Sequence, residues 1–302
     1  MELRALRYLL AVAEAGNFTR AAERCFVSQP ALSQQIRKLE EELGEVLVDR
    51  SLTPVRLTAA GEVVVAHARR MLAELAAMRV ALDELQGLRR GHLIIGAVQT
   101  VRTYLMPYAV TTFARTYPDV RLQVLELPAD EVEAGVLEGR FHLGLSFVPT
   151  VQEGLDTEPL FTEELVLIVP PDHALAGQQV VPLEVLAQTP LALLPAMYCT
   201  RRLWDRWVRA VGLHPRIRLE MNTIEGLLHA VRMLGMATVL PALTLHLEIA
   251  HDLRAVRLPR PPCRTVGIIY RQGAYRCLAA RTFAEVLRSW RRTVRNGQAA
   301  AA

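Results

Sequence analysis

Residues 18–43, FTRAAERCFVSQPALSQQIRKLEEEL, carry the clearest structural pattern in this chain of 302 residues. They predict two short helices joined by a tight turn, the first over about 19–25 with Thr19 as its N-cap. The turn lies at residues 27–28, where the hydroxyl of Ser28 can cap the second helix. Pro30 then falls in the first turn of that helix, where a missing N–H costs nothing.

The second helix is amphipathic, and its two faces suggest different tasks. The apolar residues recur at steps of four, three and four and form one buried stripe: Leu32, Ile36, Leu39 and Leu43. The polar face carries hydrogen-bonding side chains followed by cations: Gln29, Ser33, Gln34, Arg37 and Lys38. Such side chains read base edges and hold phosphates in the DNA major groove.

In a helix-turn-helix, the N-terminal residues of the second helix meet the bases. We therefore expect Gln29, Ser33 and Gln34 to read bases, with Ser28 and Pro30 beside them at the start of the helix. Arg37 and Lys38 would contact the DNA backbone. The alternative is an ordinary amphipathic helix pair with a solvated polar face.

The exact residues favour DNA binding. The stretch 11–50, and within it VSQPALSQQIRKLEEELG (27–44), closely resembles the winged helix-turn-helix of LysR-type transcriptional regulators. The next segment, LVDRSLTPVRLTAAG (47–61), is similar to the wing of that family, with two short strands around a turn at Ser51–Pro54. The resemblance implies that Arg50 and Arg56 reach flanking phosphates or the minor groove.

A long helix follows the wing. Thr58 can cap it, and it should run to about Gln86, with Gly87 as its stop signal. Its narrow apolar stripe alternates steps of three and four, the pattern of a coiled-coil seam: Ala60, Val64, His67, Met71, Leu75, Met78, Leu82 and Leu85. We predict a homodimer through this helix, because two half-sites on DNA need two copies of the DNA-binding domain, here called the reading head. Packing against the chain's own C-terminal region is the alternative.

Composition sets outer bounds on the protein class. With 51% hydrophobic and 22% charged residues the chain is globular, and its length suggests two or three units. It shows no signal-peptide pattern and no apolar run long enough to span a bilayer. The four cysteines lack CxxC spacing and suit reduced thiols, so we expect a cytoplasmic protein without a membrane partner. Acids match cations in number within residues 1–60, so the DNA prediction rests on where the charges lie.

From about Arg89, strands alternate with helices, which is typical of an α/β domain with a parallel sheet. This layout resembles the two-lobed effector domain of the same regulators, which is similar to periplasmic solute-binding proteins. Crossovers near Thr162–Glu164 and Arg264–Val266 would hinge the lobes. The predicted fold is thus α+β and multidomain. It comprises a winged helix-turn-helix (1–58), a linker helix (59–88) and an effector domain (89–302) with lobe I at about 89–163 and 265–295 and lobe II at about 164–264.

No motif argues for catalysis. HExxH, GxSxG, P-loop and GxGxxG patterns are all missing from the sequence, so we expect no enzyme, cofactor or metal site. A solute-binding protein would share the α/β half but would need an export signal and would lack the N-terminal reading head. The resemblance implies a transcriptional activator or repressor that binds operator DNA and contacts RNA polymerase. It also implies a homotetramer formed by pairing of effector domains.

Several strand-to-helix turns should converge between the lobes, where helix N-termini and hydroxyls favour an anion. The residues we expect around a small-molecule effector are Gln99, Thr100, Val101, Phe147, Met197, Tyr198, Thr200, Asn222 and Thr223. The polar ones among them could equally be plain N-caps. The segments at 222–243 and 264–283 resemble the cyanate-responsive branch of the family, so cyanate is the favoured ligand. An aromatic acid against Phe147, Met197 and Tyr198 is the runner-up.

Cys199 raises a third alternative for the signal. Peroxide-sensing relatives use a cysteine pair in the second lobe, whereas the next cysteine in this sequence is Cys263. We therefore expect Cys199 to line the pocket or to be merely buried.

Overall fold

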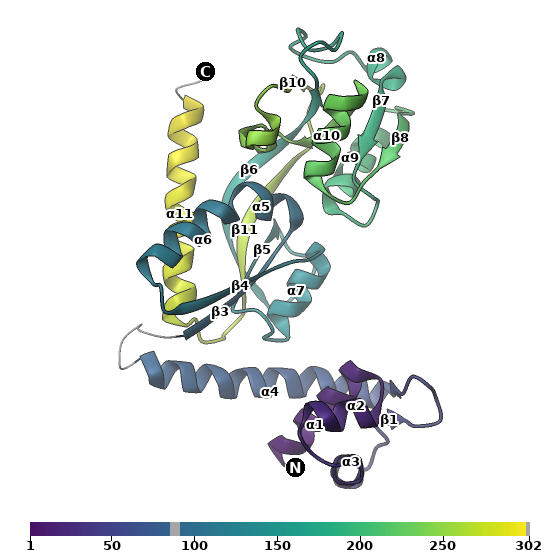
Figure 1. Cartoon of the computed structure of the whole chain (residues 1–302), viewed down its shortest axis with the longest axis vertical. Helices are drawn as coiled ribbons and strands as arrows, with labels where there is room; N and C mark the ends of the chain where they lie inside the picture. The colour runs from purple at the N-terminus through teal and green to yellow at the C-terminus, as the bar shows by residue number, and fades with distance from the viewer. Residues whose placement is uncertain (85–90, 300–302) are drawn as a thin grey trace. The chain divides into compact units, whose positions relative to one another are not determined.

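The computed structural model describes residues 1–84 and 91–299 (Figure 1). Its internal contacts divide the chain into two compact units. The first is Met1–Gln86 with Leu137–Arg140, and the second is Gly87–Val136 with Phe141–Ala302. The expected end of the linker helix at Gln86 and Gly87, and the seam residue Leu85, lie outside the described residues.

The first unit contains the predicted helix pair and wing. Helices α1 (Leu3–Ala15), α2 (Phe18–Arg24) and α3 (Gln29–Leu43) precede two antiparallel strands, β1 (Val48–Asp49) and β2 (Arg56–Leu57), and then α4 (Ala59–Glu84). Ser28 caps α3 as expected, its hydroxyl accepting the N–H of Ala31 at 3.4 Å.

The expected cap of the first helix of the pair is wrong. Asn17 caps α2 in place of Thr19, because its Oδ1 accepts the backbone N–H groups of both Thr19 (2.8 Å) and Arg20 (3.1 Å). One amide oxygen thus satisfies two of the free donors at the helix start, which a threonine two residues later in the helix cannot do. The helix consequently begins at Phe18.

The apolar stripe of α3 is shorter than predicted. Leu32 and Ile36 are fully buried and Leu39 is 1% exposed, but Leu43 is 40% exposed. The helix ends at Gly44, whose φ of +71° is the left-handed conformation that favours glycine, so its last turn extends past the core. The buried face of α3 therefore covers residues 32–39 only.

Helix α4 belongs partly to this core and leaves much of the rest of its apolar stripe exposed, with Leu75 half-buried. Thr58 caps it through a hydrogen bond from the N–H of Gly61 at 3.0 Å. Val65 and Ala68 in its first half are buried against α1–α3. Further along, the stripe is open: Met71 is 44%, Met78 53% and Leu82 57% exposed.

The second unit is built on one mixed sheet with strand order β4-β3-β5-β11-β6-β9-β7-β8, and β10 pairs with β6. The strands are β3 (Gly91–Ala97), β4 (Val120–Glu126), β5 (Leu143–Val148), β6 (Leu155–Val169), β7 (Pro190–Leu193), β8 (Arg216–Glu220), β9 (Ala237–Pro241), β10 (Arg254–Arg257) and β11 (Cys263–Arg271). The helices are α5 (Gln99–Tyr104), α6 (Met106–Thr116), α7 (Ala129–Leu137), α8 (Leu183–Gln188), α9 (Cys199–Ala210), α10 (Ile224–Leu234) and α11 (Leu278–Ala299), with short 3-10 turns at Ala242–His246 and Glu248–Ala250.

Two long strands join the halves of this unit (Figure 1). β6 pairs antiparallel with β11 over residues 155–164, then with β9 and β10 over residues 165–169. The predicted crossovers lie opposite each other in this pairing, Thr162 against Thr265 and Glu163 against Arg264. The remaining pairings of β3 with β4 and β5, and of β7 with β8 and β9, are parallel. The two-lobed α/β architecture is confirmed.

Helices cover both halves of the sheet. In one half, the rings of Phe113 (α6) and Phe283 (α11) pack with centroids 5.5 Å apart. In the other, α9 covers one face through Trp204 and Trp207, while α10 covers a second cluster around Leu227. α5, α8 and β10 were not predicted; each has only four or six residues, too few for a clear hydrophobic period.

Candidate nucleic-acid interface and effector site

The polar face of α3 is open. Gln29, Gln34, Arg37 and Lys38 are exposed, and within residues 1–84 and 91–299 their side chains make no hydrogen bond or ion pair. Ser33, in the middle of this face, is half-buried. Unpaired amide groups and cations along one helix face can bind base edges and phosphates without first breaking internal contacts.

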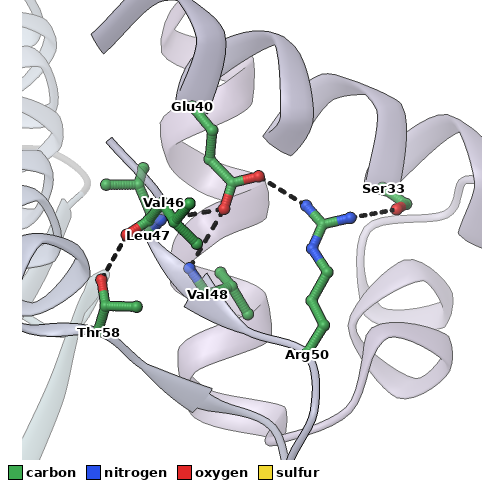
Figure 2. A network of polar contacts seen from close by, with 7 residues as sticks. All are labelled: Ser33, Glu40, Val46, Leu47, Val48, Arg50 and Thr58. Atoms are coloured by element: carbon green, nitrogen blue, oxygen red, sulfur yellow. Dashed lines mark hydrogen bonds and ion pairs between the residues drawn. The ribbon is translucent and has the colours of Figure 1, made fainter. Parts of the chain in front are cut away.

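A polar network ties α3 to the wing (Figure 2). One oxygen of the Glu40 carboxylate accepts the backbone N–H groups of Leu47 (3.0 Å) and Val48 (3.2 Å) at the start of the wing. Its other oxygen pairs with the guanidinium of Arg50 at 2.8 Å. Arg50 also donates to the hydroxyl of Ser33 at 3.3 Å and lies over the Phe18 ring, 5.2 Å from its centroid.

The two wing arginines are thus unlike each other. Arg50 is held inside the reading head by Glu40 and Ser33, with 30% of its side chain exposed. Arg56 is exposed and has no polar partner in the part of the chain that the structure describes. Of the two, Arg56 is the one free to approach a phosphate.

In the second unit, the polar site centres on Arg264, which was not among the predicted site residues. Its guanidinium pairs with Glu163 at 2.7 Å, and their side chains are only 7% and 1% exposed. It donates to the hydroxyls of Thr200 at 2.8 Å and Thr100 at 2.9 Å, and lies 4.0 Å from the ring centroid of Phe147. One buried cation therefore links β6, β5, α5 and α9.

Tyr104 completes this cluster. Its phenol donates to the second oxygen of Glu163 at 2.6 Å. Burial and the negative charge of Glu163 raise the pKa of Tyr104 well above its ordinary value of 10, so the phenol keeps its proton as a donor. Glu163 thus accepts from a fixed phenol and a fixed guanidinium. This satisfies the carboxylate, which burial would otherwise destabilise.

The structure brings most of the predicted effector residues together. Gln99, Thr100, Phe147, Tyr198 and Thr200 line one small cavity of about 10 Å³, room for about one water molecule. The side-chain amide of Gln99 donates to the backbone carbonyl of Asn222, which brings Asn222 to the same place. The Gln99 Oε1 atom is buried and has no partner within the described residues.

Three predicted effector residues lie elsewhere or have a plainer role. Val101 is fully buried in the core, whereas Met197 is 56% exposed. The hydroxyl of Thr223 accepts the N–H of Gly226 at 3.3 Å and so caps α10. For Thr223 the N-cap alternative therefore describes its observed contact.

A larger cavity of about 840 Å³ adjoins the small one, shares Ala129, Phe147 and Cys199 with it, and is also lined by Arg264. One wall is apolar and includes Val148, Pro149 and Val151. The α9 side carries three exposed arginines, Arg202, Arg206 and Arg209. Cys263 lines this cavity too, so folding places the two cysteines, distant in sequence, around one space.

Sequence reasoning missed Arg264 and Glu163 as site residues because no local pattern marks them. They are 101 positions apart, and only the register of β6 against β11 makes them neighbours. The available signal was the charged residue at each predicted crossover, since a charge inside a buried crossing strand needs a partner.

Sequence comparison agrees with this architecture. The model of the bacterial regulatory helix-turn-helix proteins of the lysR family matches residues 3–62, and the model of the LysR substrate binding domain matches residues 86–292. The chain therefore belongs to the LysR family of bacterial regulatory proteins. It is a DNA-binding transcriptional regulator with a C-terminal effector-binding domain.

Individual relatives cover nearly the whole chain. The dual regulator OxyR of Escherichia coli K12 is 33% identical over 277 residues, 91% of this chain and 90% of its own length. A probable RuBisCO transcriptional regulator of Cyanophora paradoxa is also 33% identical, over 293 residues, 94% of this chain and 90% of its own.

Solved structures give the same picture. A full-length OxyR variant from Pseudomonas aeruginosa is 28% identical with a TM-score of 0.74, covering 95% of this chain and 98% of its own. CbnR in complex with its target DNA is 26% identical with a TM-score of 0.66, covering 96% of this chain and 99% of its own. Within residues 1–84 and 91–299, no helix is long and apolar enough to cross a membrane.

Proposed function

We propose that this regulator binds operator DNA through α3 and the wing, and that a compact anion held at Arg264 controls it. The DNA-contacting residues are Gln29, Ser33 and Gln34 on bases, with Arg37, Lys38 and Arg56 on phosphates. The open polar face of α3 supports this assignment, as does the similarity to CbnR, which was solved with its target DNA. The protein acts in the cytoplasm, where it meets RNA polymerase.

We propose the division foreseen from the sequence, with a reading head at 1–58, a linker helix at 59–88 and an effector domain at 89–302. The linker helix joins two copies, and pairing of effector domains gives a tetramer. The exposed stripe of Met71, Met78 and Leu82 supports the dimer, because a second α4 helix would cover it.

The observation that carries the effector proposal is the reach of Arg264 to hydroxyls on both lobes. Thr100 comes from α5 and Thr200 from α9, and each accepts from the guanidinium. The Thr200 hydroxyl keeps its own proton to donate to an acceptor such as an anion, whereas the Thr100 hydroxyl also interacts with the Tyr104 phenol and would turn from it to an anion. The small cavity beside them has room for about one water molecule, so a compact ion such as cyanate or a small carboxylate would bind there only as α5 and α9 move apart.

Ligand binding at this site would act on the angle between the lobes. An anion that pairs with Arg264 competes with Glu163 and changes the contacts that hold α5 and α9 to one guanidinium. The ligand can shift the arrangement only by its difference in affinity for the two states. In a tetramer such a change alters the spacing of the reading heads on DNA.

Calorimetry on the full-length protein tests this site with cyanate and acetate as probes. Thr100→Val removes one hydroxyl donor and should weaken binding roughly tenfold. Thr103→Val is the matched control, because this buried hydroxyl donates to the Gln99 carbonyl of its own helix at 2.9 Å. Equal affinity in wild type and Thr100→Val would place the effector elsewhere.

The larger cavity favours a different ligand class, an anion with an apolar body. Its volume of about 840 Å³ fits a small organic molecule, and its walls pair an apolar surface with the α9 arginines, which together with Arg264 outnumber the carboxylates that also line it, Asp130, Glu133 and Asp205. Benzoate is the corresponding probe. If benzoate binds, and Arg206→Gln weakens it while Thr100→Val does not, the effector is an aromatic acid and the compact-anion proposal is wrong.

A second candidate function, sensing of peroxide, is favoured by the surroundings of Cys199. Its sulfur accepts a hydrogen bond from Arg202 at 2.9 Å, at the start of α9. Peroxide would oxidise the thiol to a sulfenic acid and release water. Mass spectrometry after mild peroxide treatment tests this. The oxidised product should still form in the control variant Cys263→Ser and should be lost in Cys199→Ser. An unmodified Cys199 would remove this candidate.

A further inference from the structure

We propose that Arg50 is a positioning residue of the reading head, and that it fixes Ser33 as a hydrogen-bond donor toward the operator. The base facing Ser33 would then be one that offers an acceptor in the major groove. This inference rests on the proposed reading of DNA by α3. It adds which partner donates in one contact: Ser33 donates and the base accepts.

The guanidinium of Arg50 is held from several sides (Figure 2). Glu40 anchors it at 2.8 Å and is itself fixed by the N–H groups of Leu47 and Val48. The Phe18 ring lies 5.2 Å away on another side. The remaining arm reaches the Ser33 hydroxyl at 3.3 Å. Since Glu40 lies on α3 and Arg50 directly follows β1, the pair also sets the distance between wing and helix.

The direction of the hydrogen bond follows from the chemistry of the two groups. A guanidinium has only donors, whereas a serine hydroxyl has one donor and two acceptor sites. Ser33 Oγ must therefore accept from Arg50, and its own proton remains for another partner. The nearby positive charge further favours a partner that carries an acceptor atom.

The bases differ in what they offer to such a donor. Guanine presents N7 and O6 in the major groove, adenine N7 and thymine O4, but cytosine presents only its N4 amino donor. A cytosine facing Ser33 would bring two donors together. We therefore expect discrimination against cytosine at the position that Ser33 reads, by roughly threefold to tenfold.

The competing role for Arg50 is a direct phosphate contact, and salt dependence separates the two. Loss of one phosphate contact lowers the slope of log K against log salt by about 0.9. Loss of a positioning residue leaves that slope unchanged and alters base preference. Arg56, exposed and unpaired, provides the matched phosphate-type control on the same wing.

The test uses full-length protein and the DNA fragment from directly upstream of its gene that the wild type binds, with each base pair varied singly. Binding is measured at several salt concentrations for wild type, Ser33→Ala, Arg50→Met, Arg56→Met and the double variant of residues 33 and 50. Arg50→Met keeps the aliphatic stem beside Phe18. Arg50→Lys is included because it keeps the charge opposite Glu40 without a planar fork.

We expect Ser33→Ala and Arg50→Met to lose preference at the same position, and the double variant to lose no more than either alone. Arg50→Lys should stay folded and lose the same preference, whereas Arg56→Met should lower the salt slope only. If Arg50→Met lowers the slope by about one and keeps the preference, or if Arg50→Lys keeps both the slope and the preference, the inference is wrong. If Ser33→Ala changes no preference either, reading by Ser33 itself fails, which is a separate result.

Discussion

Basic side chains have opposite surroundings in the reading head and in the Arg264 cluster. On α3, Arg37 and Lys38 are exposed and lack an ion-pair partner within the described chain, so they are ready for a polyanion. Between the lobes, Arg264 is 7% exposed and already bound to Glu163 and two hydroxyls. A ligand can add itself to the first site, but it must compete with internal contacts at the second.

This contrast explains how each region could act. Open cations give affinity that depends on salt and needs little rearrangement of the protein. A buried ion pair whose hydrogen bonds are all made holds its neighbours in one set of contacts. An anion that competes for the pair changes which groups are bonded to each other. The first property suits DNA binding and the second suits a switch.

The largest expected effect comes from breaking the buried pair. Glu163→Gln leaves Arg264 as an uncompensated buried cation and should lower the free energy of unfolding of the second unit by about 3–5 kcal/mol. All three tryptophans, Trp204, Trp207 and Trp290, lie in that unit, so urea unfolding followed by tryptophan fluorescence reports it directly.

The control for that variant is Glu158→Gln on the same strand. Glu158 pairs with Arg288 at 2.6 Å, but both side chains are more than a third exposed, Glu158 at 34% and Arg288 at 43%. Solvent screening should keep its cost below about 1 kcal/mol. Equal losses in the two variants would contradict the claim that the Arg264 site is an internally paired, buried one.

The next effect concerns the other open surface of the first unit, the stripe of α4. Leu75→Glu places a charge in the proposed seam and should weaken dimerisation by at least about 2 kcal/mol, with operator binding reduced in parallel. Ala76→Glu, exposed on a different face of α4, should leave the dimer intact. Light scattering across a dilution series measures both, and a wild-type monomer that still binds its operator would end the dimer proposal.

The smallest expected effect concerns His173, another polar group of the second unit whose hydrogen bond is made inside the protein. His173 Nδ1 accepts the N–H of Leu175 at 3.1 Å, and burial lowers the pKa of His173 below its ordinary 6.5. Its neutral ring therefore contributes stability fully above pH 6.5, and this is lost as pH falls toward the lowered folded pKa.

His173→Asn keeps an acceptor at the Nδ1 position and removes the titration. Tryptophan-monitored unfolding between about pH 7 and 5 should show a steeper loss of stability in wild type than in this variant. Parallel curves for the two proteins would show that the imidazole is not held neutral by the fold.

The sequence revealed the reading head more fully than the effector site, and the reason is distance along the chain. Ser28, Leu32 and Ile36 follow from helix spacing and capping, which act within a few residues. Errors near the head were also local: Asn17 caps α2 two residues before the predicted cap, and Leu43 extends past the core.

The effector half shows the limit of such reasoning. Most strand positions followed from hydrophobic runs, except residues 155–164 of β6 and all of β10, and the crossovers followed from the family resemblance. Thr100 and Thr200 do meet at one guanidinium. The guanidinium itself, and Glu163 opposite it, depend on the register of two strands about a hundred residues apart. No local pattern encodes that register.

The most direct test of the central claim, that the N-terminal turns of α3 read bases while its later cations hold phosphates, compares Gln29→Ala with Lys38→Ala. Operator affinity is measured for both against a base-substituted fragment and across salt concentrations. Gln29→Ala should cost roughly 1–3 kcal/mol of specific binding and relax base preference, whereas Lys38→Ala should weaken all sequences equally and lower the salt slope by about one. A changed base preference in Lys38→Ala together with an unchanged one in Gln29→Ala would contradict the account.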